Sequence, residues 1–184
     1  MSINELISVM KKSSIDNKDL PIKLESMDAL IDALSLISNR SDKSLNATVI
    51  FNEGENCNFF EAFSSTQAEQ SFTEFLEENG TKLTVLTNDT KKLKNTNLYK
   101  KFTTSKYELR AIPQKFINRV RSETPGSVRS YFLGDKESII VGDFDFNDPN
   151  RSTFVNFYDQ KRASTLFKSY NKLKDTVQNN GGSK

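Results

Sequence analysis

Residues 128–146 read VRSYFLGDKESIIVGDFDF, and this stretch decides the fold. Two runs rich in β-branched and aromatic residues, 128–133 and 138–141, flank the turn sequence Gly134-Asp135-Lys136-Glu137, and the second run closes on Gly142. A Gly-Asp step between two short runs of this kind is typical of a β-hairpin with buried strands. We therefore predict a strand pair here, around which the rest of the chain is organised.

The spacing within this stretch resembles the signature of the phospholipase D superfamily, H-x-K-x-x-x-x-D-x-x-x-x-x-x-G-S-x-N. Two signature residues are kept, Asp135 and Gly142. The other four signature positions hold different residues: Val128 for His, Ser130 for Lys, Asp143 for Ser and Asp145 for Asn. The resemblance implies a phospholipase D-like α/β fold, in which a mixed sheet is flanked by helices.

The order of elements after the hairpin also resembles the end of a phospholipase D-like domain, where a strand leads into a final helix. Residues 148–151 predict a loop, 153–158 a strand, and a helix begins at Lys161. The apolar residues of this helix recur at helical spacing and share one face. They are Ala163, Leu166, Phe167, Tyr170 and Leu173.

Although the spacing resembles the signature, the residues that carry out the family's chemistry are absent from this sequence. The resemblance implies a His nucleophile that takes the phosphoryl group and a Lys that stabilises charge on the phosphate. Val128 has no lone pair, Ser130 has no fixed positive charge, and the chain contains no His that a second copy could supply. We therefore predict a non-catalytic domain, a pseudoenzyme.

A parallel strand pair is predicted upstream of the hairpin. Strand 46–52 is followed by helix 66–79, which Gly80 ends, and then by strand 81–87. This order predicts a βαβ unit with a right-handed crossover, and strand 107–112 extends the sheet up to Pro113. Three shorter stretches stay open: 59–63 and 115–123 as helix or extended chain, and 91–101 as helix or loop.

The first 45 residues are predicted to form a helical extension before a domain of residues 46–176. A helix over 2–12 is broken by polar residues 13–19, residues 20–22 are extended, and a second helix covers 27–38 with an apolar stripe. That stripe predicts either a core helix or a helix that binds a protein partner. The tail, residues 177–184, is predicted to be disordered.

Charge is unevenly distributed along the chain. Residues 53–78 contain seven carboxylates and no Lys or Arg, whereas residues 82–129 contain twelve bases and three acids. Ligands of parallel α/β sheets bind at the carboxyl ends of the strands, and several of these bases follow such ends. The candidate nucleic-acid-binding residues are Lys91, Lys92, Lys94, Lys100, Lys101, Lys115, Arg119, Arg121 and Arg129.

Three functional hypotheses follow. The alternative to all of them is that the lysine-rich loops are solvated and bind no ligand. The first is binding of DNA, RNA or another phosphate-bearing ligand by these basic residues. In this hypothesis, the nucleobases stack on the aromatic side chains of Tyr99, Phe102, Tyr107 and Phe116. The second is a protein-interaction subunit, a homodimer through the degenerate motif face with a further partner on the N-terminal helices. The third is a residual metal-dependent phosphodiesterase that uses Asp143 and Asp145, which would share one face of a strand.

Composition indicates the cellular compartment and the kind of genome from which the protein comes. Cys57 is the single cysteine, so no intramolecular disulfide is expected, and the apolar segments are too short to span a bilayer. The N-terminus lacks the apolar core of a signal peptide, which predicts a cytoplasmic protein without a membrane partner and with no cofactor. The many Asn and Lys residues indicate an AT-rich coding sequence and favour a phage, plasmid or low-GC bacterial origin.

Overall fold

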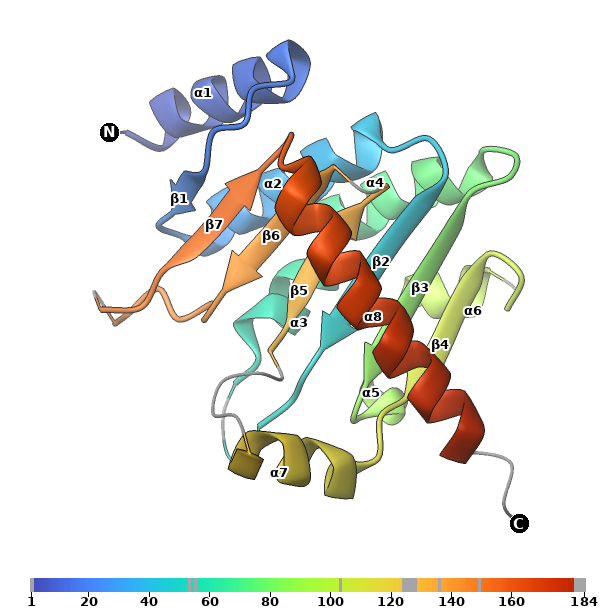
Figure 1. Cartoon of the computed structure of the whole chain (residues 1–184). Coiled ribbons are helices and arrows are strands. Elements are labelled where there is room, and N and C mark those ends of the chain that lie inside the picture. The colour runs from blue at the N-terminus through green and yellow to red at the C-terminus, as the bar shows by residue number, and fades with distance from the viewer. Residues whose placement is uncertain are drawn as a thin grey trace.

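A mixed sheet of seven strands forms the centre of the molecule, in the order β1-β7-β6-β5-β2-β3-β4 (Figure 1). The computed structural model describes residues 2–52, 54, 56–102, 104–123, 129–135, 137–148 and 150–180. The strands are β1 (Ile22–Leu24), β2 (Ser44–Val49), β3 (Lys82–Thr87), β4 (Tyr107–Ala111), β5 (Tyr131–Gly134), β6 (Ser138–Gly142) and β7 (Thr153–Asn156). Helices flank the sheet on both faces, which confirms the predicted α/β class.

The predicted hairpin is formed by β5 and β6, which pair antiparallel with Leu133 opposite Ile139. Asp135 adopts a left-handed conformation in the turn, with φ 47°, which Asp tolerates better than most residues. The first strand begins at Tyr131 and not at the predicted residue 128. Val128 lies outside the described residues.

The predicted βαβ unit is also confirmed. Strands β2 and β3 are parallel, and β4 adds a further parallel strand beside β3. The crossover contains α3 (Asn58–Phe63), which settles the open assignment of residues 59–63, and α4 (Thr66–Glu77). Ser65 caps α4 by accepting a hydrogen bond from the Ala68 amide.

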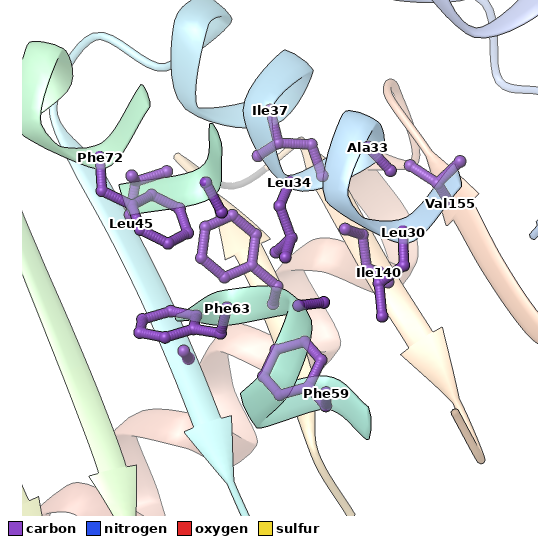
Figure 2. Close-up of a cluster of buried hydrophobic side chains, with 14 of the residues drawn as sticks. Leu30, Ala33, Leu34, Ile37, Leu45, Phe59, Phe63, Phe72, Ile140 and Val155 are labelled. Atoms are coloured by element: carbon purple, nitrogen blue, oxygen red, sulfur yellow. The ribbon is translucent and has the colours of Figure 1, made fainter. Parts of the chain in front are cut away.

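One face of the sheet is covered by α2 (Met27–Arg40), α3 and α4. Figure 2 shows Leu30 and Leu34 of α2 turned toward Ile140 of the sheet, and all three are fully buried. Phe63 of α3 contacts Phe72 of α4, with ring centroids 4.7 Å apart. Each such side chain contributes about 1.5–3 kcal/mol when removed from water.

The opposite face carries the long helix α8 (Gln160–Asn180), with α7 (Gln114–Glu123) near one end of the sheet. Ala163 and Tyr170 are buried there, and the other three residues of the predicted apolar face are partly buried against them. Tyr170 Oη donates to the Thr84 carbonyl at 3.1 Å. The predicted disorder from residue 177 is wrong as far as Asn180, because α8 continues to that residue, and 181–184 lie outside the described residues.

Residues 22–40 are not an extension, which corrects the predicted organisation of the first 45 residues. Strand β1 pairs with β7, Ile22 opposite Val155, and the apolar stripe of α2 is part of the core. Before them, α1 (Ile3–Asp16) runs past the predicted break, and Ser13 is buried within it. The stripe of α2 is therefore not available to a protein partner. No helix in the described part of the chain is long and apolar enough to cross a membrane.

Candidate functional site

Strands β2, β3 and β4 are parallel and end at one edge of the sheet, which we call the carboxyl edge. Asn88, directly after β3, joins the segments that follow all three strands. Its Oδ1 accepts from the Phe51 amide at 2.9 Å, and its Nδ2 donates to the Phe51 carbonyl at 2.8 Å. The same Nδ2 donates to Gln114 Oε1 at 3.0 Å, at the start of α7. One side chain thus aligns the loops from which the basic helices begin.

Three of the predicted bases lie on α5 (Thr90–Lys94), at this edge. Asp89 caps the helix, and its Oδ1 accepts from the Lys91 and Lys92 amides at 3.1 and 3.2 Å. The ammonium of Lys92 lies 4.4 Å from the centroid of the Phe51 ring. Lys91, Lys92 and Lys94 are exposed, and none of them forms an ion pair with a described residue.

Helix α7 brings further bases to the carboxyl edge. Lys115 and Arg119 are exposed, and the Arg119 guanidinium lies 5.6 Å from the centre of the Phe116 ring. The side chain of Arg121 lies outside the described residues. Arg129, just before β5, is half exposed and binds Asp143 at 2.7 Å. The edge is therefore basic on the helices after β3 and β4 and partly neutralised beside β5.

Lys100 and Lys101 lie elsewhere, on α6 (Asn97–Lys101). Lys101 Nζ contacts Glu77 Oε1 at 2.8 Å, at the end of α4, which leads into the amino end of β3. Lys101 therefore lies toward the amino end of β3, away from the α5 and α7 bases. Lys100 is exposed on the same short helix, which packs Leu98 into the core that also holds Leu93 of α5.

The aromatic residues predicted to stack on bases are mostly buried. Tyr107 is fully buried and contacts Tyr99 edge to face, with ring centroids 5.4 Å apart. Burial raises the pKa of the Tyr107 phenol well above its usual value. Tyr99 and Phe102 are partly buried against the same core. Of these four residues, only Phe116 lies beside the basic side chains of the carboxyl edge.

The signature positions within the described residues serve the fold. Ser130 Oγ accepts from the buried Ile50 amide at 3.0 Å. Asp135 accepts from the amides of residues 42, 43 and 44 at 2.7, 3.1 and 2.8 Å, and so fixes the loop that enters β2. A Cβ at Gly142 would lie 2.5 Å from Thr153 Cα, so β7 can approach only a glycine there. The two kept residues thus have structural roles.

Asp143 and Asp145 do not form the predicted carboxylate pair. They lie in a loop, and Phe144 between them is left-handed, with φ 55°, and packs its ring 4.7 Å from that of Phe59. Asp143 binds Arg129, while Asp145 lies 3.6 Å from Arg151. Among the residues that the structure describes, no three His, Cys, Asp or Glu gather in a group that could hold a metal.

A groove of about 710 Å³ opens between α7 and α8, over β5, β6 and β7. Its apolar lining consists of Phe116, Val120, Tyr131, Val141, Phe154, Leu166 and Leu173. Its charged lining residues are Arg119, Arg129 and Lys172, and none of the described lining residues is acidic. The sequence analysis did not single out Tyr131, Phe154 or Lys172. The alternation of side chains along a strand is the signal that separates Phe154 from the buried Val155.

No protein-family model and no curated protein matches the sequence. Among solved structures, the chain is similar to TrmBL2, an archaeal chromatin protein whose structure shows a novel mode of DNA binding, with a TM-score of 0.59 and 12% identity. The match covers 95% of this chain and 60% of that one, so the chain spans less than two thirds of TrmBL2. NucT from Helicobacter pylori matches with a TM-score of 0.47 and 9% identity, over 86% of this chain and 96% of NucT. At this level of identity, the likeness to TrmBL2 shows a shared fold.

Proposed function

We propose that this chain is a non-catalytic phospholipase D-like domain that binds the phosphate backbone of nucleic acid through its carboxyl edge. The observation that carries the proposal is the set of bases on α5 and α7, which have no carboxylate partner among the described residues and start from loops that Asn88 ties together. Exposed bases that no described carboxylate neutralises create a positive potential that attracts an anionic ligand.

The physical basis is the release of counterions from the nucleic acid. Each phosphate that a Lys or Arg neutralises adds affinity that falls as salt rises. TrmBL2, whose fold this chain shares, is described as a chromatin protein with a novel mode of DNA binding. That description supports a nucleic acid as the ligand over other phosphate compounds.

A non-catalytic role follows from the chemistry of the motif. The chain contains no His, so the covalent step that the family resemblance implies has no nucleophile. Ser130, at the position of the family Lys, accepts a backbone hydrogen bond and carries no charge. Asp143 and Asp145 are each held by an arginine. Binding without cleavage is the function that these residues support.

The test is binding of the purified chain to labelled DNA and RNA oligonucleotides at two salt concentrations. Glu substitutions at Lys91, Lys92 and Lys94 should weaken binding at low salt by at least about tenfold, because three bases at one surface become acidic. The matched control reverses Lys11, Lys12 and Lys18, which lie on or just after α1, far from the carboxyl edge, and changes the net charge equally.

The control variant should keep most of the affinity. Equal losses in both triple variants would mean that net charge alone attracts the oligonucleotide, and would contradict a binding surface at the carboxyl edge. Absence of binding by the wild-type chain at low salt would overturn the proposal. Light scattering on the same samples tests the predicted homodimer, which stays a prediction.

A further inference from the structure

The floor of the groove between α7 and α8 is a single row of residues in register across four strands. Thr48 of β2 pairs with Tyr131 of β5, Tyr131 with Val141 of β6, and Val141 with Phe154 of β7. Residues paired in this way place their side chains on the same face, about 4.5–5.5 Å from one strand to the next. The row therefore presents two aromatic rings with an aliphatic residue between them.

The row is exposed at Phe154 and more buried at Tyr131, whose ring packs edge to face against Tyr170, with centroids 6.4 Å apart. Phe154 is 36% exposed although it lies within a strand, and Tyr131 and Val141 are partly exposed. Burial raises the pKa of the Tyr131 phenol to about 12. Phe116 of α7 adds a third aromatic side chain on the wall of the groove.

Three cations surround this apolar floor. Arg119 comes from α7, Arg129 from the segment before β5, and Lys172 from α8. Arg129 is partly neutralised by Asp143, while Arg119 and Lys172 form no ion pair with a described residue. An occupant that complements both parts of the groove has a flat apolar portion and a negative charge at its side. A nucleotide with an unpaired base meets both requirements.

We propose that the groove between α7 and α8 binds an unpaired nucleotide of a single-stranded nucleic acid, with the base on the Tyr131–Phe154 row and the phosphate beside Arg119 and Lys172. The bases of a duplex are stacked on one another and cannot reach this floor, whereas the bases of a single strand stack readily on aromatic side chains. The groove volume of about 710 Å³ lies in the usual range of ~300–1,000 Å³ for ligand sites.

The groove continues the carboxyl edge, because Arg119 belongs to both. A strand whose backbone follows the bases of α5 and α7 would pass the mouth of the groove at this residue. The inference thus rests on the proposed function and deepens it, since it assigns a single strand as the preferred nucleic acid. It also gives the exposed ring of Phe154 a role that packing of the core does not require.

The chain contains no Trp, so a Trp introduced by substitution reports on its own surroundings. Phe154→Trp places the reporter in the groove, and Leu20→Trp places a control at an exposed site before β1. A single-stranded oligonucleotide should quench the fluorescence of the F154W chain and leave that of the L20W chain unchanged. A duplex of the same length should bind at the carboxyl edge without quenching either variant.

A pair of alanine variants on α7 tests the phosphate contact. Arg119→Ala should lower affinity for the single strand about tenfold more than affinity for the duplex, because the phosphate contact of Arg119 holds the base in the groove and one stacked base contributes roughly that factor. Lys115→Ala, one turn earlier and outside the groove lining, should lower both affinities alike. Thermal melts of each variant, followed by circular dichroism, confirm that the chains are folded.

The outcomes separate the two proposals. Binding of single strand and duplex with equal affinity, and no quenching in F154W, would overturn the groove assignment and leave the carboxyl edge as the binding surface. Quenching of F154W by a free mononucleotide but not by a strand would also overturn it. No binding of either nucleic acid at low salt overturns both the proposed function and this inference.

Discussion

Asn88 holds the backbone of Phe51 on both sides, since its amide accepts from the Phe51 N–H and donates to the Phe51 carbonyl, at 2.9 and 2.8 Å. The two residues are far apart in sequence and follow neighbouring parallel strands. The two hydrogen bonds tie the segment after β2 to the segment after β3, as ladder hydrogen bonds tie the two strands themselves. It keeps Phe51 under the ammonium of Lys92.

Asn88→Ala should lower the free energy of unfolding by about 1–3 kcal/mol, because the partly buried polar groups of Phe51 lose their partners. Chemical denaturation measures the loss. Asn118→Ala is the matched control: its side chain makes one exposed hydrogen bond, with Gln114, and the change should cost less than about 0.5 kcal/mol. Equal stability of the two variants would mean that water replaces Asn88 without cost.

Glu108 should make the stability of the protein depend on pH in the acid range. Its carboxylate lies 2.7 Å from Lys82 Nζ and 3.6 Å from Lys174 Nζ, and it also contacts Arg110. Burial acts to raise the pKa of Glu108, but these three cations outweigh it and lower the pKa to about 2. A carboxyl with a lowered folded-state pKa stabilises the fold above its unfolded pKa of about 4.3.

This stabilisation should disappear progressively as the pH falls from about 4.5 toward 2, because protonation removes the charge that the cations bind. Glu108→Gln should therefore lower stability at pH 7 by about 1–2 kcal/mol, after allowance for solvent screening, and flatten this part of the pH profile. Glu77→Gln, which removes an exposed pair with Lys101, is the control and should change neither. A wild-type profile that is flat below pH 4.5 would contradict the role of Glu108.

Gly142→Ala should be far more destabilising than Gly80→Ala. Both glycines have a positive φ, 154° and 81°, so both substitutions introduce backbone strain of about 1 kcal/mol. At Gly80 the new methyl group meets nothing within 4 Å, whereas at Gly142 it would overlap the backbone of Thr153. Thermal denaturation should show an additional loss of about 2 kcal/mol or more at Gly142. A similar loss at both sites would mean that β7 moves aside easily.

Asp135→Ala should destabilise the fold by about 2–3 kcal/mol, because three amides before and at the start of β2 lose a charged acceptor. Asp135→Asn keeps one side-chain oxygen and tolerates the left-handed backbone, so it should lose about half as much. Denaturant titration of both variants measures the difference. If Asp135→Ala unfolds at the wild-type midpoint, the kept signature Asp has no structural role.

Several elements were predictable because the chemistry that specifies them is local. The hairpin follows from a turn sequence between two apolar runs, and the buried face of α8 from residues three and four positions apart. The parallel pair β2 and β3 follows from the order strand, helix, glycine and strand. The absence of His is a property of composition alone.

The arrangement of the site was not predictable in the same way, because it depends on contacts between distant residues. Lys94 and Lys101 are close in sequence, yet Lys94 forms no ion pair with a described residue, whereas Lys101 pairs with Glu77 at the end of α4. Arg119 and Lys172 are distant in sequence and line one groove. Asp143 and Asp145 would share a face of a strand, but the left-handed Phe144 between them, anchored on Phe59, separates them.

The sequence by itself determined the class of the fold, the hairpin, the parallel unit and the absence of His, since each rests on residue type and short-range periodicity. Only the tertiary structure decided that residues 22–24 complete the sheet beside β7 and that Tyr131 and Phe154 fall into one row. Register between strands depends on which side chains must be buried together, and that condition is met only when the whole chain is folded.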